Sequence, residues 1–266
     1  MQPIVRFISA AFFVLCSCLP SPARAETAKA PQRELLVYCG ITMVKPITEI
    51  ARMVEKKENI RITISQGGSE DLYQSAKKSR LGDLYLPGEP SYRTKYLHEG
   101  LLGEYVTVGY NQLALLVAKG NPRKVRGDVR ELLRNDLKVI VGNAESGSVG
   151  KATRTLLDKN KIYRKVVDRA VFLAPDSRSL NIALRKNEGD VALNWRATGF
   201  FPDNSKLLDV VDLDTKTAHP EPLLLIMLTF SQQKEHARRF MDFALSPQGQ
   251  EIFRAYGFHD NTLRTK

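Results

Sequence analysis

The 266-residue chain is long enough for two domains of about 100–130 residues each. A content of 43% hydrophobic and 26% charged residues excludes an intrinsically disordered protein. The formal charge of +11 does not indicate nucleic-acid binding, because the basic residues are scattered through helical segments and have acidic neighbours. We therefore expect no nucleic-acid partner.

Residues 1–25 have the features of a secretory signal peptide. Arg6 precedes an apolar run over residues 7–19, which is too short to span a membrane comfortably, and an Ala-x-Ala cleavage motif stands at residues 23–25. Residues 15–18 also resemble a lipoprotein cleavage box, with Cys18 as the lipidated residue. The sequence thus predicts a periplasmic protein, either soluble or anchored through Cys18, and no later segment predicts a transmembrane helix.

The first half of the remaining chain predicts strands that alternate with helices. We expect strands over residues 35–41, 59–65 and 83–86, and helices over residues 45–57, 72–79 and 91–99. This β-α-β-α-β order is typical of an α/β protein with a parallel sheet. A long apolar strand follows over residues 112–118, and the Lys-Gly-Asn-Pro sequence after it indicates a change of domain nearby.

The second half continues the alternation. Strands are expected over residues 138–142, 171–173, 190–194, 206–213 and 222–230. Helices are expected over residues 129–133, 151–158, 161–168, 178–187 and 233–245, with a last one from Ser246-Pro247 to about residue 256. The strand over 206–213 is predicted to be an edge strand, and those over 112–118 and 222–230 are predicted to cross between domains.

Small or hydroxyl residues follow several predicted strands at the start of a helix. They are Thr42, Ser69, Ser148 with Val149, and Ser177. Ligands of open α/β sheets bind at the carboxyl ends of strands, where helix N-termini offer free N–H groups and a positive dipole end. Each residue alone would fit a simple helix cap. Together they predict a cage of hydroxyl and N–H groups that holds a doubly charged anion without a full countercharge.

Other residues have two interpretations each. Cys39 is the single cysteine after the leader. It is either a small buried hydrophobic residue or a soft ligand near the bend at the predicted cleft. Trp195 follows a predicted strand and either packs in a core or lines the cleft. Arg178 and Arg196 either add positive charge to the site or cover helix surfaces.

Catalytic and metal-binding motifs are missing from the sequence. The histidines have no serine or cysteine partner motif: His98, His219, His236 and His259. Residues 147–151 resemble a phosphate-binding loop but lack its upstream glycine and the hydroxyl residue after Lys151. One cysteine excludes an internal disulfide and a cysteine-rich zinc site. We therefore expect no enzyme, no cofactor and no metal site.

Several motifs resemble those of the molybdate-binding proteins of bacterial ABC importers, over about residues 35–258. They are the strand at 36–42, the Gly-Ser pair at 68–69, Gly-Asp-Leu-Tyr at 82–85, the loop at 141–150, Asp-Ser-Arg at 176–178, and the C-terminal Ser-Pro-Gln-Gly-Gln-Glu-Ile-Phe at 246–253 with Tyr-Gly-Phe at 256–258. The C-terminal match is the most specific one, and it reports the fold more than the ligand.

The resemblance implies roles for individual residues. Thr42 and Ser69 fall where serines bind the anion, and Val149 and Ser177 fall where backbone N–H groups bind it. Trp195 falls where the family usually has a binding tyrosine, and its indole N–H can donate one hydrogen bond. Additional cleft residues would be Cys39, Gly40, Gly68, Ser148 and Arg178.

The resemblance also implies a fold and a function. The fold would be the two-lobed α/β fold of periplasmic binding proteins, with lobe one over residues 34–109 plus 223–266 and lobe two over residues 110–222. The protein would be a monomer that binds molybdate or tungstate and delivers it to a membrane permease of an ABC importer. Trp195 and the Cys-Gly-Ile sequence at 39–41 depart from the family pattern. Another small anion as ligand, or a sensor kinase as partner, therefore stays open.

Overall fold

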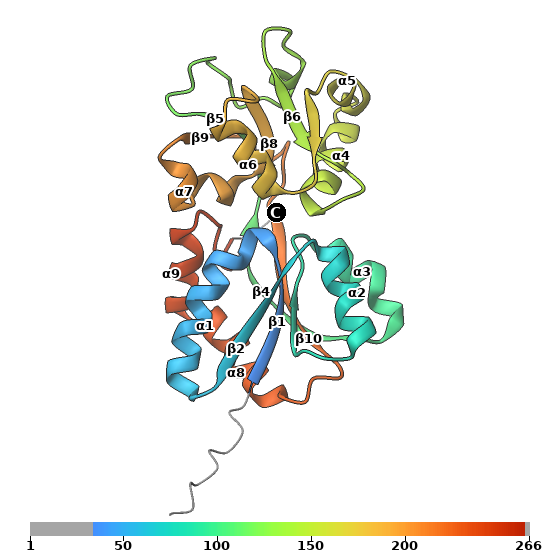
Figure 1. Cartoon of the computed structure of the whole chain (residues 1–266), viewed down its shortest axis with the longest axis vertical. Helices are drawn as coiled ribbons and strands as arrows, with labels where there is room; N and C mark the ends of the chain where they lie inside the picture. Colours follow the sequence, from blue (N-terminus) through green and yellow to red (C-terminus); the bar gives the residue numbers. More distant parts are fainter. Residues whose placement is uncertain (1–33, 264–266) are drawn as a thin grey trace, which may run out of the picture. The chain divides into compact units, whose positions relative to one another are not determined.

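The computed structural model describes residues 34–263 (Figure 1). The predicted signal peptide and Cys18 lie outside the described residues. The described part is an α/β protein with two sheets, each flanked by helices, as predicted. We call each sheet with its helices a lobe. No helix within residues 34–263 combines the length and the hydropathy that are needed to cross a bilayer.

The first lobe contains a sheet with the strand order β2-β1-β3-β10-β4. Its strands are β1 (Glu34–Gly40), β2 (Arg61–Gly67), β3 (Leu84–Leu86), β4 (Leu102–Asn111) and β10 (Glu221–Leu228). Its helices are η1 (Ile41–Met43), α1 (Val44–Glu58), α2 (Ser69–Ser79), α3 (Ser91–Tyr96), η2 (Leu97–Glu99), α8 (Lys234–Leu245) and α9 (Pro247–Ala255). Strand β1 is parallel to β2 and β3, whereas β10 is antiparallel to β3 and β4. The carboxyl ends of β1, β2 and β3 therefore meet at one edge.

The second lobe contains a sheet with the strand order β7-β6-β8-β5-β9. Its strands are β5 (Leu113–Ala118), β6 (Val139–Gly142), β7 (Phe172–Ala174), β8 (Val191–Trp195) and β9 (Leu208–Asp212). Its helices are η3 (Val129–Leu133), α4 (Ser148–Lys159), α5 (Tyr163–Val167), α6 (Ser177–Arg185), η4 (Arg196–Phe200) and α7 (Pro202–Ser205). Strand β6 is parallel to β7 and β8, and β9 is an edge strand, as predicted.

Amphipathic helices close the two faces of the first sheet. Helix α1 buries apolar residues that recur every three or four positions: Ile47, Ile50, Ala51 and Val54. They pack with Leu35, Val37 and Cys39 of β1, which share one face because strand side chains alternate. On the other face Tyr73 stacks on Tyr96, with 3.8 Å between ring centroids. The second sheet has a core of its own, built on β5, β6 and β8.

The chain passes between the sheets at Gln112. Strand β4 ends at Asn111 in the first sheet and β5 starts at Leu113 in the second. The side chain of Gln112 donates a 3.0 Å hydrogen bond to the carbonyl of Leu213, beside the returning connection. The prediction that the strands at 112–118 and 222–230 cross between domains is wrong, because β5 and β10 each belong to one sheet. The predicted residue boundaries of the lobes stay a prediction.

Strand β4 is the strand that the sequence analysis missed among the described residues. It contains Gly103 and Gly109, which weaken the pattern of a strand. Its register with β10 shifts between Leu223 and Leu224, as in a β-bulge. Antiparallel pairing with the apolar β10 stabilises this strand, and such a long-range pairing is not visible in the local sequence.

Candidate functional site

A cavity of about 30 Å³ lies where elements of both lobes begin, and we call it the anion cavity. It is lined by residues of the turns before η1, α2, α4 and α6 and after β3: Ile41, Thr42, Gly67, Gly68, Ser69, Gly88, Gly147, Ser148, Val149, Pro175, Asp176 and Ser177. Since one water needs roughly 10–15 Å³ by this measure, the volume suits about two waters or a compact ion.

The first lobe contributes Ser69, which is 2% exposed. Its hydroxyl oxygen accepts a 2.9 Å hydrogen bond from the N–H of Gly88, and its carbonyl accepts a 2.8 Å bond from the hydroxyl of Tyr85. These two bonds join the start of α2 to β3 and to the turn that follows it. Ser69 is therefore held in one position at the wall of the cavity.

A hydroxyl pair joins the two lobes across the cavity. The side-chain oxygens of Thr42 and Ser177 are 3.1 Å apart, and both residues are buried. The amide nitrogen of Asn194 donates 3.0 Å hydrogen bonds to the carbonyl of Ser177 and to the side-chain oxygen of Asn181. Asn194 is fully buried and positions the start of α6. Sequence reasoning missed this role, although Asn194 stands at the end of a predicted apolar strand.

Three helices of nine or more residues point their N-termini at the cavity. Helix α2 starts at Ser69, α4 at Ser148 and α6 at Ser177. The caps of α2 and α4 are Gly68 and Gly147, so no side-chain oxygen occupies their first N–H groups. The sequence prediction that Ser69 itself caps α2 is wrong, because its preceding glycine takes that position. These uncapped N–H groups are free to bind an anion.

The electrostatics of the cavity come from dipoles. None of the lining residues in the described part of the chain is a lysine, arginine or histidine. The one carboxylate, Asp176, caps α6 by accepting a 2.7 Å hydrogen bond from the N–H of Ser179. The positive ends of three helix dipoles therefore face the cavity, and hydroxyl and N–H donors surround it.

Two glycines permit close approaches around the cavity. A Cβ atom at Gly88 would lie 2.3 Å from the hydroxyl oxygen of Ser148, across the two lobes. A Cβ atom at Gly150 would lie 1.8 Å from the backbone oxygen of Asn143. The start of α4 can therefore approach both β3 and the loop after β6 only because neither position has a side chain. Gly88 follows a strand end, which could have identified it from the sequence.

The structure brings six of the predicted site residues together around the anion cavity. They are Thr42, Gly68, Ser69, Ser148, Val149 and Ser177. Cys39 and Gly40 do not line the anion cavity. Cys39 is fully buried in the first core, where burial raises the pKa of its thiol, and Gly40 packs against Met43 and Gly88.

Arg178 and Trp195 line other hollows. Arg178 donates a 3.1 Å hydrogen bond to the side-chain oxygen of Gln66, across the lobes, and lines a groove of about 280 Å³. Trp195 is 1% exposed and lines a separate cavity of about 140 Å³. Arg196 forms a 2.8 Å ion pair with Asp212. Roles of these side chains in ligand binding stay predictions.

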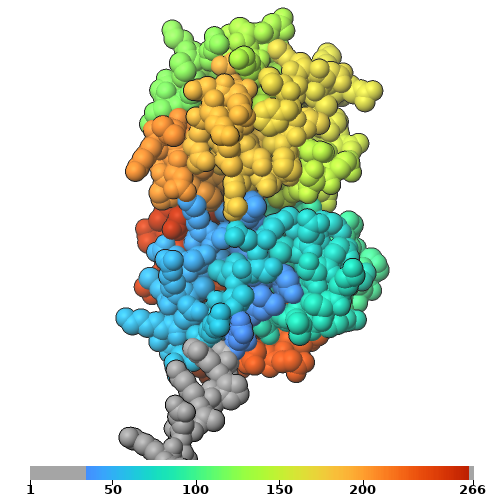
Figure 2. Space-filling view, in the orientation of Figure 1, coloured from blue at the N-terminus to red at the C-terminus, as the bar shows by residue number. Residues whose placement is uncertain are grey.

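Polar contacts hold the lobes against each other beside the cavity. Lys151 of α4 forms a 3.0 Å ion pair with Glu89 and a hydrogen bond with Ser91. Lys45 of α1 pairs with Asp203 of α7 at 2.5 Å. Figure 2 shows atoms of the two lobes in contact along their boundary on the face in view. The lobes therefore enclose the cavity in this structure.

The described residues do not offer a metal site. Between residues 34 and 263 no group of three or more histidine, cysteine, aspartate or glutamate side chains is close enough to hold a metal ion. The arrangement can hold an anion through hydrogen bonds, while the carbonyl of Ser69 and one carboxylate oxygen of Asp176 already accept hydrogen bonds from Tyr85 and Ser179.

Comparisons with known proteins agree with this architecture. A model of the family of bacterial extracellular solute-binding proteins matches residues 35–259. A Haemophilus influenzae protein named "Putative binding protein" is 24% identical over 229 residues, which are 85% of this chain and 90% of that protein. 

Solved structures share the fold at lower identity. The periplasmic molybdate-binding protein of Azotobacter vinelandii has a TM-score of 0.71 and 15% identity, over 87% of this chain and 100% of that chain. PEB3 of Campylobacter jejuni with bound L-phospholactate has a TM-score of 0.69 and 17% identity, over 85% of this chain and 100% of that chain. At these identities the likeness is one of fold.

Proposed function

The chain belongs to the family of bacterial extracellular solute-binding proteins, and from this premise we propose that it is a periplasmic receptor for a small oxyanion, molybdate or tungstate. The bound anion would be delivered to the membrane permease of an ABC importer. A monomer suffices for this function, since both lobes of one chain supply the cavity. We assign no catalytic residue, cofactor or metal.

The observation that carries the proposal is the anion cavity. Hydroxyl groups of Thr42, Ser69 and Ser177 surround it, together with the uncapped starts of α2 and α4. A fully deprotonated tetrahedral anion accepts hydrogen bonds at every oxygen, so it matches a cavity of donors. An anion that keeps a proton needs an acceptor as well, and the lining offers a single carboxylate, Asp176, one oxygen of which already caps α6. This favours molybdate, tungstate or sulfate over hydrogen phosphate.

A thermal-shift panel tests the proposal. Purified protein is heated with molybdate, tungstate, sulfate, phosphate, chromate or arsenate, and each hit is followed by calorimetry. A ligand that binds only the folded state stabilises it by about 4 kcal/mol at a thousandfold excess over its Kd. We expect the largest shifts with molybdate and tungstate. No shift with any of the six anions would refute an oxyanion receptor.

A second candidate ligand is a small organic acid that carries a phosphate group. The groove of about 280 Å³ shares Thr42 and Ser177 with the anion cavity and contains three basic side chains: Lys45, Arg178 and Arg185. Such a ligand would put its phosphate in the cavity and its carboxylate among these cations, and PEB3 is a protein of the same fold that was solved with L-phospholactate. Adding phospholactate to the thermal-shift panel distinguishes the two candidates. If the ligand is an organic phosphate, phospholactate should raise the melting temperature and the six inorganic anions should not.

A receptor of this kind needs a membrane protein that receives its ligand. Closure of the lobes on the ligand would present a joint surface of both lobes to the permease. A membrane sensor kinase could be bound by the same surface. Reconstitution with the permease and ATPase of an ABC importer from the same organism would test the import role, and ligand-dependent ATP hydrolysis by that complex is the expected result.

A further inference from the structure

A second cavity of about 140 Å³ lies beside the anion cavity, and both lobes line it. Its lining is Glu89, Leu113, Ala152, Thr155, Leu156, Lys159, Trp195, Thr217, Ala218, His219 and Glu221. Helix α4 connects the two cavities, since Ser148 faces the first one and Ala152, Thr155 and Lys159, three or four positions apart, face the second. We call this second hollow the tryptophan cavity.

Trp195, which lines the tryptophan cavity, has a buried hydrogen-bond donor that is not used in the described part of the chain. Trp195 is 1% exposed, and its indole nitrogen Nε1 has no hydrogen-bond partner in the part of the chain that the structure describes. Buried indole N–H groups usually have a partner, because an unmade hydrogen bond carries a desolvation penalty. An occupant with an acceptor group would remove this penalty.

The same cavity contains a carboxylate without a partner. Glu221 is half-buried at the start of β10, and within residues 34–263 its side chain makes no ion pair or hydrogen bond. Burial raises the pKa of Glu221, and the nearby carboxylate of Glu89 raises it further, while His219 opposes both. Glu89 itself is neutralised by Lys151 at 3.0 Å. A positively charged group beside Glu221 would therefore be favoured.

The rest of the lining sets the size and polarity of the occupant. Leu113, Leu156 and Ala218 are buried apolar residues, so they favour a hydrocarbon body. Lys159 is exposed at the rim and adds one positive charge there. A cavity of this volume accommodates a small occupant, about the size of benzene or slightly larger.

We propose that the tryptophan cavity binds a small organic zwitterion, with its ammonium group beside Glu221 and its acceptor group on the indole N–H of Trp195. The occupant would contact both lobes, because Glu221 belongs to the first sheet and Trp195 to the second. This site shares no lining residue with the anion cavity. It is therefore a separate site, and its occupancy can be measured apart from oxyanion binding.

Fluorescence provides a direct test, because Trp195 is the only tryptophan of the chain. The full protein is titrated with 4-aminobutyrate, L-valine and L-proline, and calorimetry gives the dissociation constants. Butyrate lacks the ammonium group of 4-aminobutyrate, and n-butylamine lacks its carboxylate. We expect a change in emission with at least one zwitterion, and at least about tenfold weaker binding of its truncated analogue. No binding of any zwitterion up to about 10 mM would overturn the proposal.

Two variants locate the site. Glu221→Gln should weaken binding of the zwitterion at least about tenfold, whereas Glu188→Gln, an exposed glutamate on another surface, should leave it unchanged. Trp195→Phe removes the N–H group and should weaken binding in calorimetry. Thermal melting and molybdate titration of each variant check that it is folded. Unchanged zwitterion binding in folded Glu221→Gln would contradict the proposed site, whatever the result with molybdate.

Discussion

Thr42 and Ser177 are 135 positions apart in the sequence, and yet their hydroxyl oxygens are 3.1 Å apart. Each of them lies just after a strand and at the start of a helical segment, one in each lobe. With Ser69 they provide the hydroxyl donors of the anion cavity. A hydrogen bond to a charged group contributes more than one between neutral groups, so single hydroxyls should have measurable effects.

We expect Thr42→Ala and Ser69→Ala each to weaken anion binding by about 1–3 kcal/mol, because each removes a hydrogen bond to a charged ligand. Calorimetry with molybdate measures the change. Thr48→Ala is a matched control, since the hydroxyl of Thr48 bonds the carbonyl of Val44 within α1 and lies outside the cavity. Unchanged affinity in both cavity variants would exclude this cavity as the binding site.

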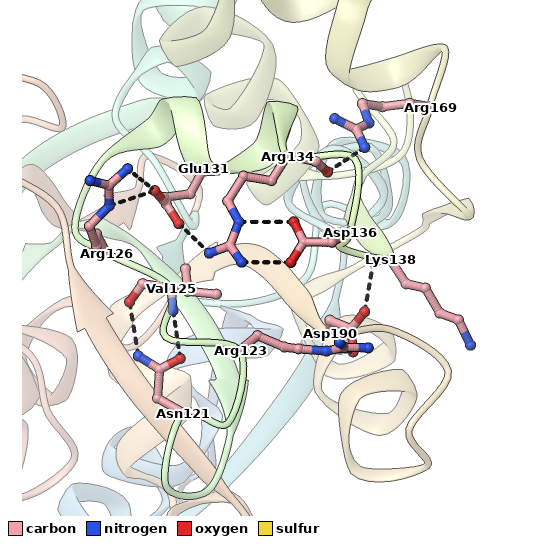
Figure 3. Close-up of polar contacts among 10 residues, drawn as sticks. All are labelled: Asn121, Arg123, Val125, Arg126, Glu131, Arg134, Asp136, Lys138, Arg169 and Asp190. Carbon is pink, nitrogen blue, oxygen red and sulfur yellow. Dashed lines mark hydrogen bonds and ion pairs between the residues drawn. The ribbon is translucent and has the colours of Figure 1, made fainter.

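Glu131 is a buried carboxylate of the second lobe and lines neither cavity. Figure 3 shows its contacts. Arg126 and Arg134 each approach its oxygens to 2.8 Å, and Arg134 also forms a two-bond pair with Asp136. Burial alone would raise the pKa of Glu131, but the hydrogen bonds from Arg134 and Arg126 outweigh it and hold this pKa below its ordinary value. The network joins the loop after β5 to the segment before β6.

We expect Glu131→Gln to lower the free energy of unfolding by about 1–3 kcal/mol at pH 7, because it leaves two arginines without their carboxylate. A pKa that is lower in the folded state stabilises the protein above the unfolded-state value of about 4.3, and this stabilisation is lost as the pH falls through the folded-state pKa. Urea unfolding is measured for wild type and variant at pH 7, 5 and 3. The difference between their free energies of unfolding should therefore shrink as the pH falls. A difference in unfolding free energy that grows as the pH falls would contradict a lowered pKa of Glu131.

Residue positions were predictable where the local pattern decides them. A hydroxyl residue between a strand and a helix lies at the carboxyl edge of a sheet, so Thr42, Ser69 and Ser177 could be assigned. Cys39 was ambiguous, although it alternates with Leu35 and Val37 and shares their buried face. The side chain of Trp195 takes its orientation from the pairing of β8 with β5, and the sequence does not specify this pairing.

At the scale of elements, the start of α4 has the tightest packing near the cavity. Gly142 at the end of β6 and Gly150 in the first turn of α4 are so close that a Cβ atom on either would overlap backbone. Helix α4 therefore begins directly after the loop at residues 143–147. The sequence analysis predicted this helix over residues 151–158. Ser, Val and Gly are weak helix formers, but tertiary packing overrides this preference at residues 148–150.

Gly150→Ala should displace the first turn of α4, since its Cβ would lie 1.8 Å from the backbone oxygen of Asn143. Ser148 and Val149 would then leave their places in the anion cavity. We expect at least about tenfold weaker molybdate binding and a lower melting temperature. Thr155→Ala, further along α4 and exposed, should change neither quantity. Full affinity in Gly150→Ala would mean that the start of α4 does not contribute to binding.

At the scale of the whole described structure, contacts across the lobes keep the cavity closed. The ion pair of Lys151 with Glu89 joins α4 to the turn after β3, and the pair of Lys45 with Asp203 joins α1 to α7. Residues Ala197 and Phe201 of the second lobe are also buried in the first core. The α/β class was predictable from the order of elements, and the two-lobed architecture from the resemblance to a known family. The contacts between lobes were not, because they involve residues far apart in the sequence.

We expect Lys151→Gln to favour the open arrangement and to speed dissociation of the anion. The effect should be at most about fivefold, because a half-exposed ion pair contributes up to about 1 kcal/mol. Stopped-flow measurement of dissociation tests this. Lys77→Gln is a matched control, since Lys77 is similarly exposed and pairs with Glu99 within the first lobe. Equal rates for both variants would show that the Lys151 contact does not hold the lobes together.

None of the described residues that line the anion cavity is basic, and this has a consequence for how binding depends on salt. Attraction between full charges is screened by dissolved ions, over a Debye length of about 8 Å at physiological ionic strength. Hydrogen bonds and helix dipoles within a closed cavity are separated from those ions, so salt has little effect on them. Affinity for the anion should therefore vary little between dilute and saline surroundings. A protein outside the cytoplasmic membrane, where ionic strength follows the environment, would capture its ligand equally well in both.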